Sequence, residues 1–260
     1  ILILTGFNKY IAPNSVYLKS MLQEQTNTSN QLIPFIIAVL IFASFTVAQS
    51  SDRTQSISFY SGAGIPVLGL NDWYGSTPIL GIQYAYRSND KTDIIFEFHY
   101  QKYNHGSIED RQFQWIIDYN YYSSSKSNAH MIWNDFILKT QKYLNNKQTQ
   151  IAGKTIVPSF SYGIGFYNYA HRVKGLIYPG QYTQPLDETY LMDPITDRRV
   201  AWGGNLGIGG YTSFNEAMNL RFGLNYHVAV GYIRAFEDWD LYEVLPLQFF
   251  TMELGIVYKF

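Results

Sequence analysis

The chain has 260 residues, of which 17% are aromatic and only 15% are charged, and its formal net charge at pH 7 is −1. Soluble domains average about a quarter charged residues, so this composition argues against a protein whose whole surface faces water. A near-neutral chain does not predict a nucleic-acid-binding protein. The absence of cysteine excludes a disulfide scaffold and thiolate chemistry.

The first predicted element is the apolar run 31–48, which is typical of a signal-peptide core. The small residues Thr46 and Ala48 lie three and one positions before Gln49, so cleavage there would leave Gln49 as the new N-terminus. An uncleaved anchor helix is the alternative, although the run is marginal for a full membrane span. Residues 1–30 form an N-terminal extension without an assigned function, and 49–260 are predicted to form one domain.

From Gln49 onward apolar residues recur with period two, which predicts strands with one apolar face. The eight segments whose alternate residues form these apolar faces are 57–59, 80–86, 94–100, 113–121, 160–166, 202–214, 220–232 and 250–260. The opposite faces are rich in glycine, polar and charged residues. The fold class predicted is all-β, a transmembrane antiparallel up-and-down β-barrel of eight strands with lipid outside and a polar lumen inside.

The connection 123–154 is too long for the short inner turn that an alternating barrel needs at this point. Within it Trp133, Ile137, Thr140 and Leu144 follow helical spacing, which predicts a short amphipathic helix at the barrel base. The alternative turns part of 131–143 and part of 186–196 into two further strands. The barrel would then have ten strands.

The polar face of the strands predicts a network of charged and polar side chains in the lumen. Its predicted members are Arg87, Glu97, His99, Asp118, Arg221, His227, Glu253 and Lys259. Buried charges must be paired, so the network is expected to plug the barrel. Glu97 beside Asp118 is also a candidate acid pair, but an ion network is favoured and no catalytic residue is assigned. The five histidines have no metal-ligand spacing, so neither a metal nor a cofactor is expected.

Two loop segments carry aromatic and acidic residues at the predicted outer rim, with Trp73 and Tyr74 in the first and Trp239 and Tyr242 in the second. Exposed aromatic side chains with polar neighbours are typical of binding hot spots. At a barrel rim they also form the interfacial girdle. The four residues are therefore candidates for an extracellular binding surface whose ligand the sequence does not identify.

Three glycine-aromatic runs, at 202–211, 219–227 and 254–260, resemble the last strands of the small outer-membrane β-barrel family called porin-family or OmpA/OmpX-like. The run 157–166 resembles the preceding strand of that family. The resemblance implies an eight-stranded barrel in the bacterial outer membrane without a known enzymatic role. It also implies an assembly signal, formed here by Leu254, Ile256, Tyr258 and Phe260, that the barrel assembly machinery reads.

The expected function is a structural or surface-interaction role in the outer membrane, with outer-membrane lipids and lipopolysaccharide as partners. A small passive porin is the alternative. A second alternative is a lipid A-modifying acyl hydrolase, because His105, Ser107 and Glu109 resemble the His and Ser two apart, with a carboxylate, of outer-membrane lipid A deacylases.

Overall fold

The computed structural model describes residues 55–104, 106–144, 149–151 and 154–260. The predicted N-terminal extension and signal-peptide core, 1–30 and 31–48, lie outside these residues. Within the described ranges, no helix combines the length and the apolar character needed to cross a membrane.

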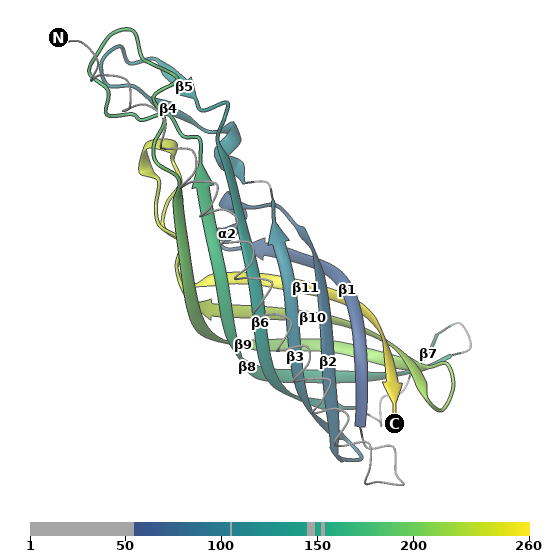
Figure 1. Ribbon diagram of the computed structural model, residues 1–260. Helices are drawn as coiled ribbons and strands as arrows, with labels where there is room; N and C mark the ends of the chain where they lie inside the picture. The colour runs from purple at the N-terminus through teal and green to yellow at the C-terminus, as the bar shows by residue number, and fades with distance from the viewer. Residues whose placement is uncertain (1–54, 105, 145–148, 152–153) are drawn as a thin grey trace, which may run out of the picture. The chain divides into compact units, whose positions relative to one another are not determined.

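Eight long antiparallel strands of the described chain close into a barrel (Figure 1). They are β1 (Gln55–Val67), β2 (Thr77–Asn89), β3 (Thr92–Tyr103), β6 (Asn128–Tyr143), β8 (Lys154–Lys174), β9 (Ile195–Ser213), β10 (Met218–Val230) and β11 (Leu247–Lys259). Each strand pairs with its neighbours in this order, and the β1–β11 pairing joins the first strand to the last. The predicted eight-stranded antiparallel barrel is therefore confirmed.

The connections at one end of the barrel are on average longer than those at the other. The short-turn end has the connections 90–91, 144–153 and 214–217, and the loop end has 68–76, 104–127, 175–194 and 231–246. Small elements lie within these connections: α2 (Leu70–Trp73), η1 (Ser107–Asp110), β4 (Gln112–Gln114), β5 (Tyr121–Ser123), β7 (Thr149–Ile151) and η3 (Glu237–Trp239). The C-terminus lies at the short-turn end (Figure 1).

The predicted fourth strand and the predicted helix are both wrong. The fourth barrel strand is β6, which contains Trp133, Ile137 and Thr140, whereas 113–121 lies in and around the β4–β5 hairpin of the loop end. The ten-strand alternative correctly made part of 131–143 a strand, but the loss of 113–121 from the barrel keeps the number of barrel strands at eight. The connection 123–154, which is too long for a short inner turn, therefore consists mainly of the strand β6 and the shorter connection 144–153.

The two faces of the barrel wall differ in polarity because successive strand residues point to opposite sides. The outer face carries exposed apolar side chains such as Phe59, Leu80, Phe96, Ile164, Leu206, Ile208, Met252 and Leu254. The inner face carries buried polar and charged groups in its middle part. Close packing inside is evident at Gly81, where an added Cβ would lie only 2.1 Å from the Tyr60 ring. Side chains therefore fill the lumen, as expected for a barrel of this size.

The buried apolar core lies towards the loop end. It joins the upper lumen residues Trp133, Tyr169 and Phe249 to side chains from the long connections, including Trp73, Trp115 and Trp239. The strands β6, β8 and β9 extend towards this end, where β4 and β5 also lie (Figure 1). We call the connections of the loop end, with their shared apolar core, the cap.

Candidate functional site

Two charged pairs occupy the middle of the lumen. Lys139 Nζ on β6 lies 2.5 Å from Glu97 Oε2 on β3. Arg221 Nη2 on β10 lies 2.8 Å from Glu253 Oε2 on β11 and 3.6 Å from Glu97 Oε2. All four residues are buried. The two carboxylates thus face two cations, which is the arrangement that makes buried charges tolerable.

Polar neighbours complete this central ion network. Asn225 Nδ2 and Thr251 Oγ1 donate hydrogen bonds to Glu253 Oε1 at 2.7 and 2.9 Å. Arg221 also donates to Gln83 Oε1. His99 Nε2 lies 2.6 Å from Glu97 Oε1. Five strands contribute to the network, so it links opposite sides of the wall and fills the lumen at this level.

His227 lies one layer closer to the cap. Its ring stacks on Phe249 with 4.7 Å between centroids and a 4° interplanar angle. Its Nε2 lies 3.2 Å from Thr251 Oγ1, and its Nδ1 lies 3.3 Å from Tyr167 Oη. The His227 ring therefore connects the central ion network to the aromatic core above it.

Two other predicted network members lie towards the short-turn end. Arg87 Nε donates to Asp93 Oδ1 at 2.8 Å, and Tyr143 Oη donates to Asp93 Oδ2 at 2.6 Å. Lys259 Nζ lies 5.6 Å from the centre of the Tyr211 ring. These groups form a separate polar layer below the central ion network.

Asp118 does not point into the lumen. It lies in the turn between β4 and β5, where it accepts hydrogen bonds from Tyr122 Oη at 2.6 Å and from Asn120 Nδ2 at 3.1 Å. The Tyr122 hydrogen bond lowers the pKa of Asp118 below its ordinary value. The predicted Glu97–Asp118 pair is wrong because the partner of β3 is β6, not 113–121.

The strand β6, which is the true partner of β3, adds two ionisable lumen residues that the sequence does not predict. Lys139 completes the Glu97 pair, and Asp135 lies opposite His99 in the β3–β6 register. Neither carboxylate oxygen of the buried Asp135 accepts a hydrogen bond from the described residues. A strand reading of 128–143 would have placed both residues on the inner face, because they share the parity of the inward Trp133.

One set of lumen groups has the spacing of metal ligands. Glu97, His99 and Glu253 each offer a ligand atom, and these atoms lie within 4.8 Å of one another. Carboxylate and imidazole groups suit several divalent cations. However, Lys139 and Arg221 already supply positive charge to both carboxylates. The geometry therefore favours an ion network over a metal centre.

The aromatic residues expected at an exposed loop surface mostly lie inside the cap. Trp73, Tyr74 and Trp239 are buried, and only Tyr242 is exposed. Trp73 packs edge-on against His171 and Phe236, with centroid distances of 5.1 and 5.8 Å. Burial raises the pKa of Tyr74 well above its ordinary value. The expectation that Trp73, Tyr74 and Trp239 are exposed for binding is wrong, because their large apolar rings fill the cap core.

Several aromatic and apolar side chains of the cap are exposed to solvent. They include Ile116, Tyr119, Tyr121, Tyr182, Tyr190 and Tyr242. Several contacts hold the segments that carry them, including the hydrogen bond that Trp115 Nε1 donates to Gln181 O at 3.0 Å. Asp187 accepts hydrogen bonds from the backbone and side chain of Thr189, which lower the Asp187 pKa. Hydrogen bonds within the cap therefore hold the segments that carry these tyrosines.

The groups named for acyl hydrolysis have other contacts. Ser107 Oγ donates a hydrogen bond to the carbonyl oxygen of Asp72, and Glu109 Oε1 accepts one from Asn128 Nδ2 at 2.9 Å. His105 lies outside the described residues. The described geometry thus supplies no base for the Ser107 hydroxyl.

The residues of the predicted assembly signal lie on the outer face of β11 and at its end. Leu254, Ile256 and Tyr258 are exposed, and Phe260 is half-buried. Their recognition by assembly machinery stays a prediction.

No protein-family model matches the chain, and no curated protein matches it. Among solved structures, Ail, the attachment invasion locus protein of Yersinia pestis, is similar at 13% identity and a TM-score of 0.41, over 79% of this chain and 97% of Ail. Neisserial surface protein A matches at 11% identity and a TM-score of 0.43, over 82% and 100% of the two chains. A major outer membrane protein from Thermus thermophilus matches at 12% identity and a TM-score of 0.45, over 79% and 99%. These identities and TM-scores are too low to indicate a function.

Proposed function

We propose that this chain is an outer-membrane β-barrel whose lumen is closed and whose cap serves as a surface for binding. The proposal rests on the observation that two groups of residues close the interior of the barrel. The central ion network fills the middle of the lumen, and the aromatic core fills the end towards the cap.

The membrane location is supported by the polarity of the wall. Isolated exposed apolar side chains are ordinary, but a continuous belt of them around a barrel marks contact with lipid. Aromatic side chains flank this belt, with Tyr86, Phe214 and Tyr258 towards the short-turn end and Trp202 nearer the cap. Such girdles are typical of the membrane interfaces. We assign the cap to the outside of the cell because outer-membrane barrels have their longer loops there.

A binding role for the cap is supported by its charge and its tyrosines. The four connections of the cap contain eleven acidic and three basic residues, although the whole chain is nearly neutral. Tyrosine gives a large contact area at a small entropic cost, which is why it is common in binding surfaces. An acidic, tyrosine-bearing surface complements a positively charged partner, so the proposed ligand class is a basic polypeptide.

Conductance across a planar bilayer tests the closed lumen. Refolded protein is expected to give no steps above background, while a water-filled porin measured in parallel does. Stable conductance from the wild-type protein would overturn the closed-lumen proposal and favour the small passive porin.

Binding of peptides to the protein in nanodiscs tests the cap. A lysine-rich peptide is expected to bind more tightly than a glutamate-rich peptide of equal length, and the difference should shrink as salt rises. Combined replacement of the exposed acids Glu237 and Asp238 by Gln and Asn should weaken binding. Replacement of the exposed Lys102 on the barrel wall by Gln is the control. Equal binding of both peptides would refute the proposed ligand class.

A further inference from the structure

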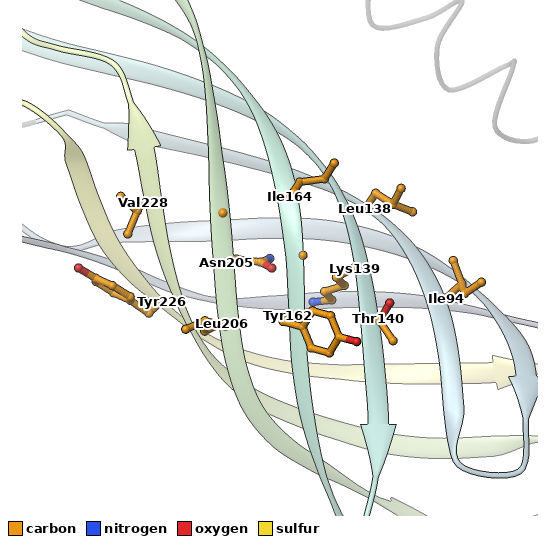
Figure 2. A pocket seen from close by; sticks show the side chains of 12 residues that line it. Ile94, Leu138, Lys139, Thr140, Tyr162, Ile164, Asn205, Leu206, Tyr226 and Val228 are labelled. Atoms are coloured by element: carbon orange, nitrogen blue, oxygen red, sulfur yellow. The ribbon is translucent and has the colours of Figure 1, made fainter.

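A groove of about 720 Å³ crosses the outer face of the barrel wall (Figure 2). Two rows of outward residues frame it. Ile94, Thr140, Tyr162, Leu206 and Tyr226 are direct partners on five neighbouring strands, β3, β6, β8, β9 and β10. Leu138, Ile164, Gly204 and Val228 form the parallel second row on β6, β8, β9 and β10.

Gly204 is the gap in the second row. An added Cβ would meet only the carbonyl oxygen of Gly163, at 3.5 Å, which is an ordinary van der Waals distance. Neither the protein interior nor the backbone therefore requires glycine at this position. Since its neighbours Ile164 and Leu206 are exposed and large, the missing side chain leaves a notch between them.

The groove is apolar along most of its length but has a positively charged end. Lys142 is exposed on the outer face of β6, and its Nζ lies 5.9 Å from the centre of the Tyr162 ring. The exposed Lys91 lies in the β2–β3 turn, and its carbonyl oxygen accepts a hydrogen bond from Tyr143 N at 2.8 Å. Both lysines therefore lie at the short-turn end, near Ile94. Lys139, which also lines the groove, is engaged by Glu97 inside the wall.

The dimensions fit one lipid chain. Four inter-strand spacings of about 4.8 Å give a length of roughly 19 Å. One leaflet of a bilayer with a hydrocarbon core of about 30 Å contributes about 15 Å. The groove starts beside the lysines and leads to Tyr226 and Val228 on β10, eight and ten residues from the start of that strand.

We propose that the groove binds one glycerophospholipid of the inner leaflet, with an acyl chain over Gly204 and the phosphate beside Lys142. The inference rests on the proposed membrane location. A phosphate complements the lysines, and lysine near a membrane interface extends its ammonium group towards the headgroups. A lipid of the outer leaflet would place its phosphates at the other end of the wall, where these lysines do not lie.

Native mass spectrometry of the detergent-solubilised full chain tests the proposal. The probes are phosphatidylglycerol and a diacylglycerol with the same acyl chains. The wild-type protein is expected to retain one phosphatidylglycerol more tightly than diacylglycerol. Lys142→Gln should weaken phosphatidylglycerol binding up to about fivefold, as expected for an exposed ion pair. Lys102→Gln, at another exposed wall lysine, should leave it unchanged.

Filling the notch tests the position of the acyl chain. Gly204→Leu should weaken retention by about four- to fifteenfold, as expected when one or two methylene contacts are lost. Ser61→Leu places the same side chain on the outer face of β1, outside the groove, and should have no effect. If Gly204→Leu does not fold, Ile164→Trp narrows the same groove from a position that already holds a large exposed side chain.

Equal effects of Gly204→Leu and Ser61→Leu would overturn the proposal, as would equal retention of the two lipids. Insertion into vesicles, scored by protection of the barrel from added protease, is measured first. A protein that inserts but retains no lipid refutes this site alone, whereas a protein that does not insert refutes the membrane location as well.

Discussion

Lys139 and Glu97 form a fully buried ion pair across the β3–β6 strand pair, with 2.5 Å between Nζ and Oε2. His99 and Arg221 also approach the Glu97 carboxylate, at 2.6 and 3.6 Å. One carboxylate thus joins side chains from three strands in a lumen too narrow for bulk water.

We expect Lys139→Met to destabilise the barrel by about 3–5 kcal/mol, because it leaves the Glu97 charge with one cation fewer in a buried site. The double variant Lys139→Met with Glu97→Gln should recover much of this loss, since it removes both charges. Urea midpoints of the protein refolded in phospholipid vesicles, followed by tryptophan fluorescence, measure the effect. Lys102→Met, at an exposed position on β3, is the control. Additive single and double effects would contradict the ion pair.

Asp135 and Asp93 are both buried carboxylates of the lumen, but their surroundings differ. Asp93 accepts hydrogen bonds from Arg87 and Tyr143, whereas Asp135 has no hydrogen-bond partner among the described residues. The same substitution should therefore change stability in opposite directions. Asp93→Asn should destabilise the barrel by about 1–3 kcal/mol. Asp135→Asn should stabilise it, because it removes a buried carboxylate that accepts no hydrogen bond from the described residues. The measurement is again the urea midpoint, and two shifts of the same sign would refute the assignment.

The barrel and most of its strands were predictable because one wall face is apolar and the other is polar. This alternation is clear in β11, where Met252 and Leu254 are outward and Thr251 and Glu253 are inward. It is blurred in β6, because Met131, Trp133 and Ile137 are inward and apolar where the strand meets the cap core. Over a short window, a strand with apolar residues on both faces has the same spacing of apolar residues as a helix. This is why the spacing in this region predicts a helix although 128–143 is a strand.

The central ion network was partly predictable for the same reason. Parity alone placed Glu97, His99, Arg221, His227 and Glu253 inward, but parity does not say which strands are neighbours. The error at 113–121 therefore paired Glu97 with Asp118 instead of Lys139. The predicted exposure of the loop tryptophans is wrong for a different reason. Local composition does not reveal whether long connections pack on one another. Trp73 and Trp239 share one core although they are far apart in sequence.

The buried Trp239 provides a test of the cap core. Its ring packs against Phe113 at 5.3 Å between centroids, and its side chain is almost fully buried. Trp239→Ala should cost about 3–5 kcal/mol locally and make the connections of the cap sensitive to added protease. The barrel strands should stay protected, because their backbone hydrogen bonds are made within the closed sheet and do not involve Trp239. Tyr242→Ala, at the exposed neighbour, should leave the cap resistant, and equal cleavage of both variants would contradict the buried core.

The outer face of β11 provides the most direct test of the membrane location. Leu254 is exposed near the middle of this strand, opposite the inward Glu253. In a bilayer, Leu254→Arg should cost about 2–4 kcal/mol, because the guanidinium group would lie in hydrocarbon. Tyr242→Arg places the same charge on the exposed cap, where it meets water and should cost little. Both variants are refolded into phospholipid vesicles, and their urea midpoints are compared with that of the wild-type protein. A wall that faces water would tolerate arginine at both positions equally, so equal midpoints would refute a membrane-spanning barrel. A loss confined to Leu254→Arg would instead support hydrocarbon around the middle of β11.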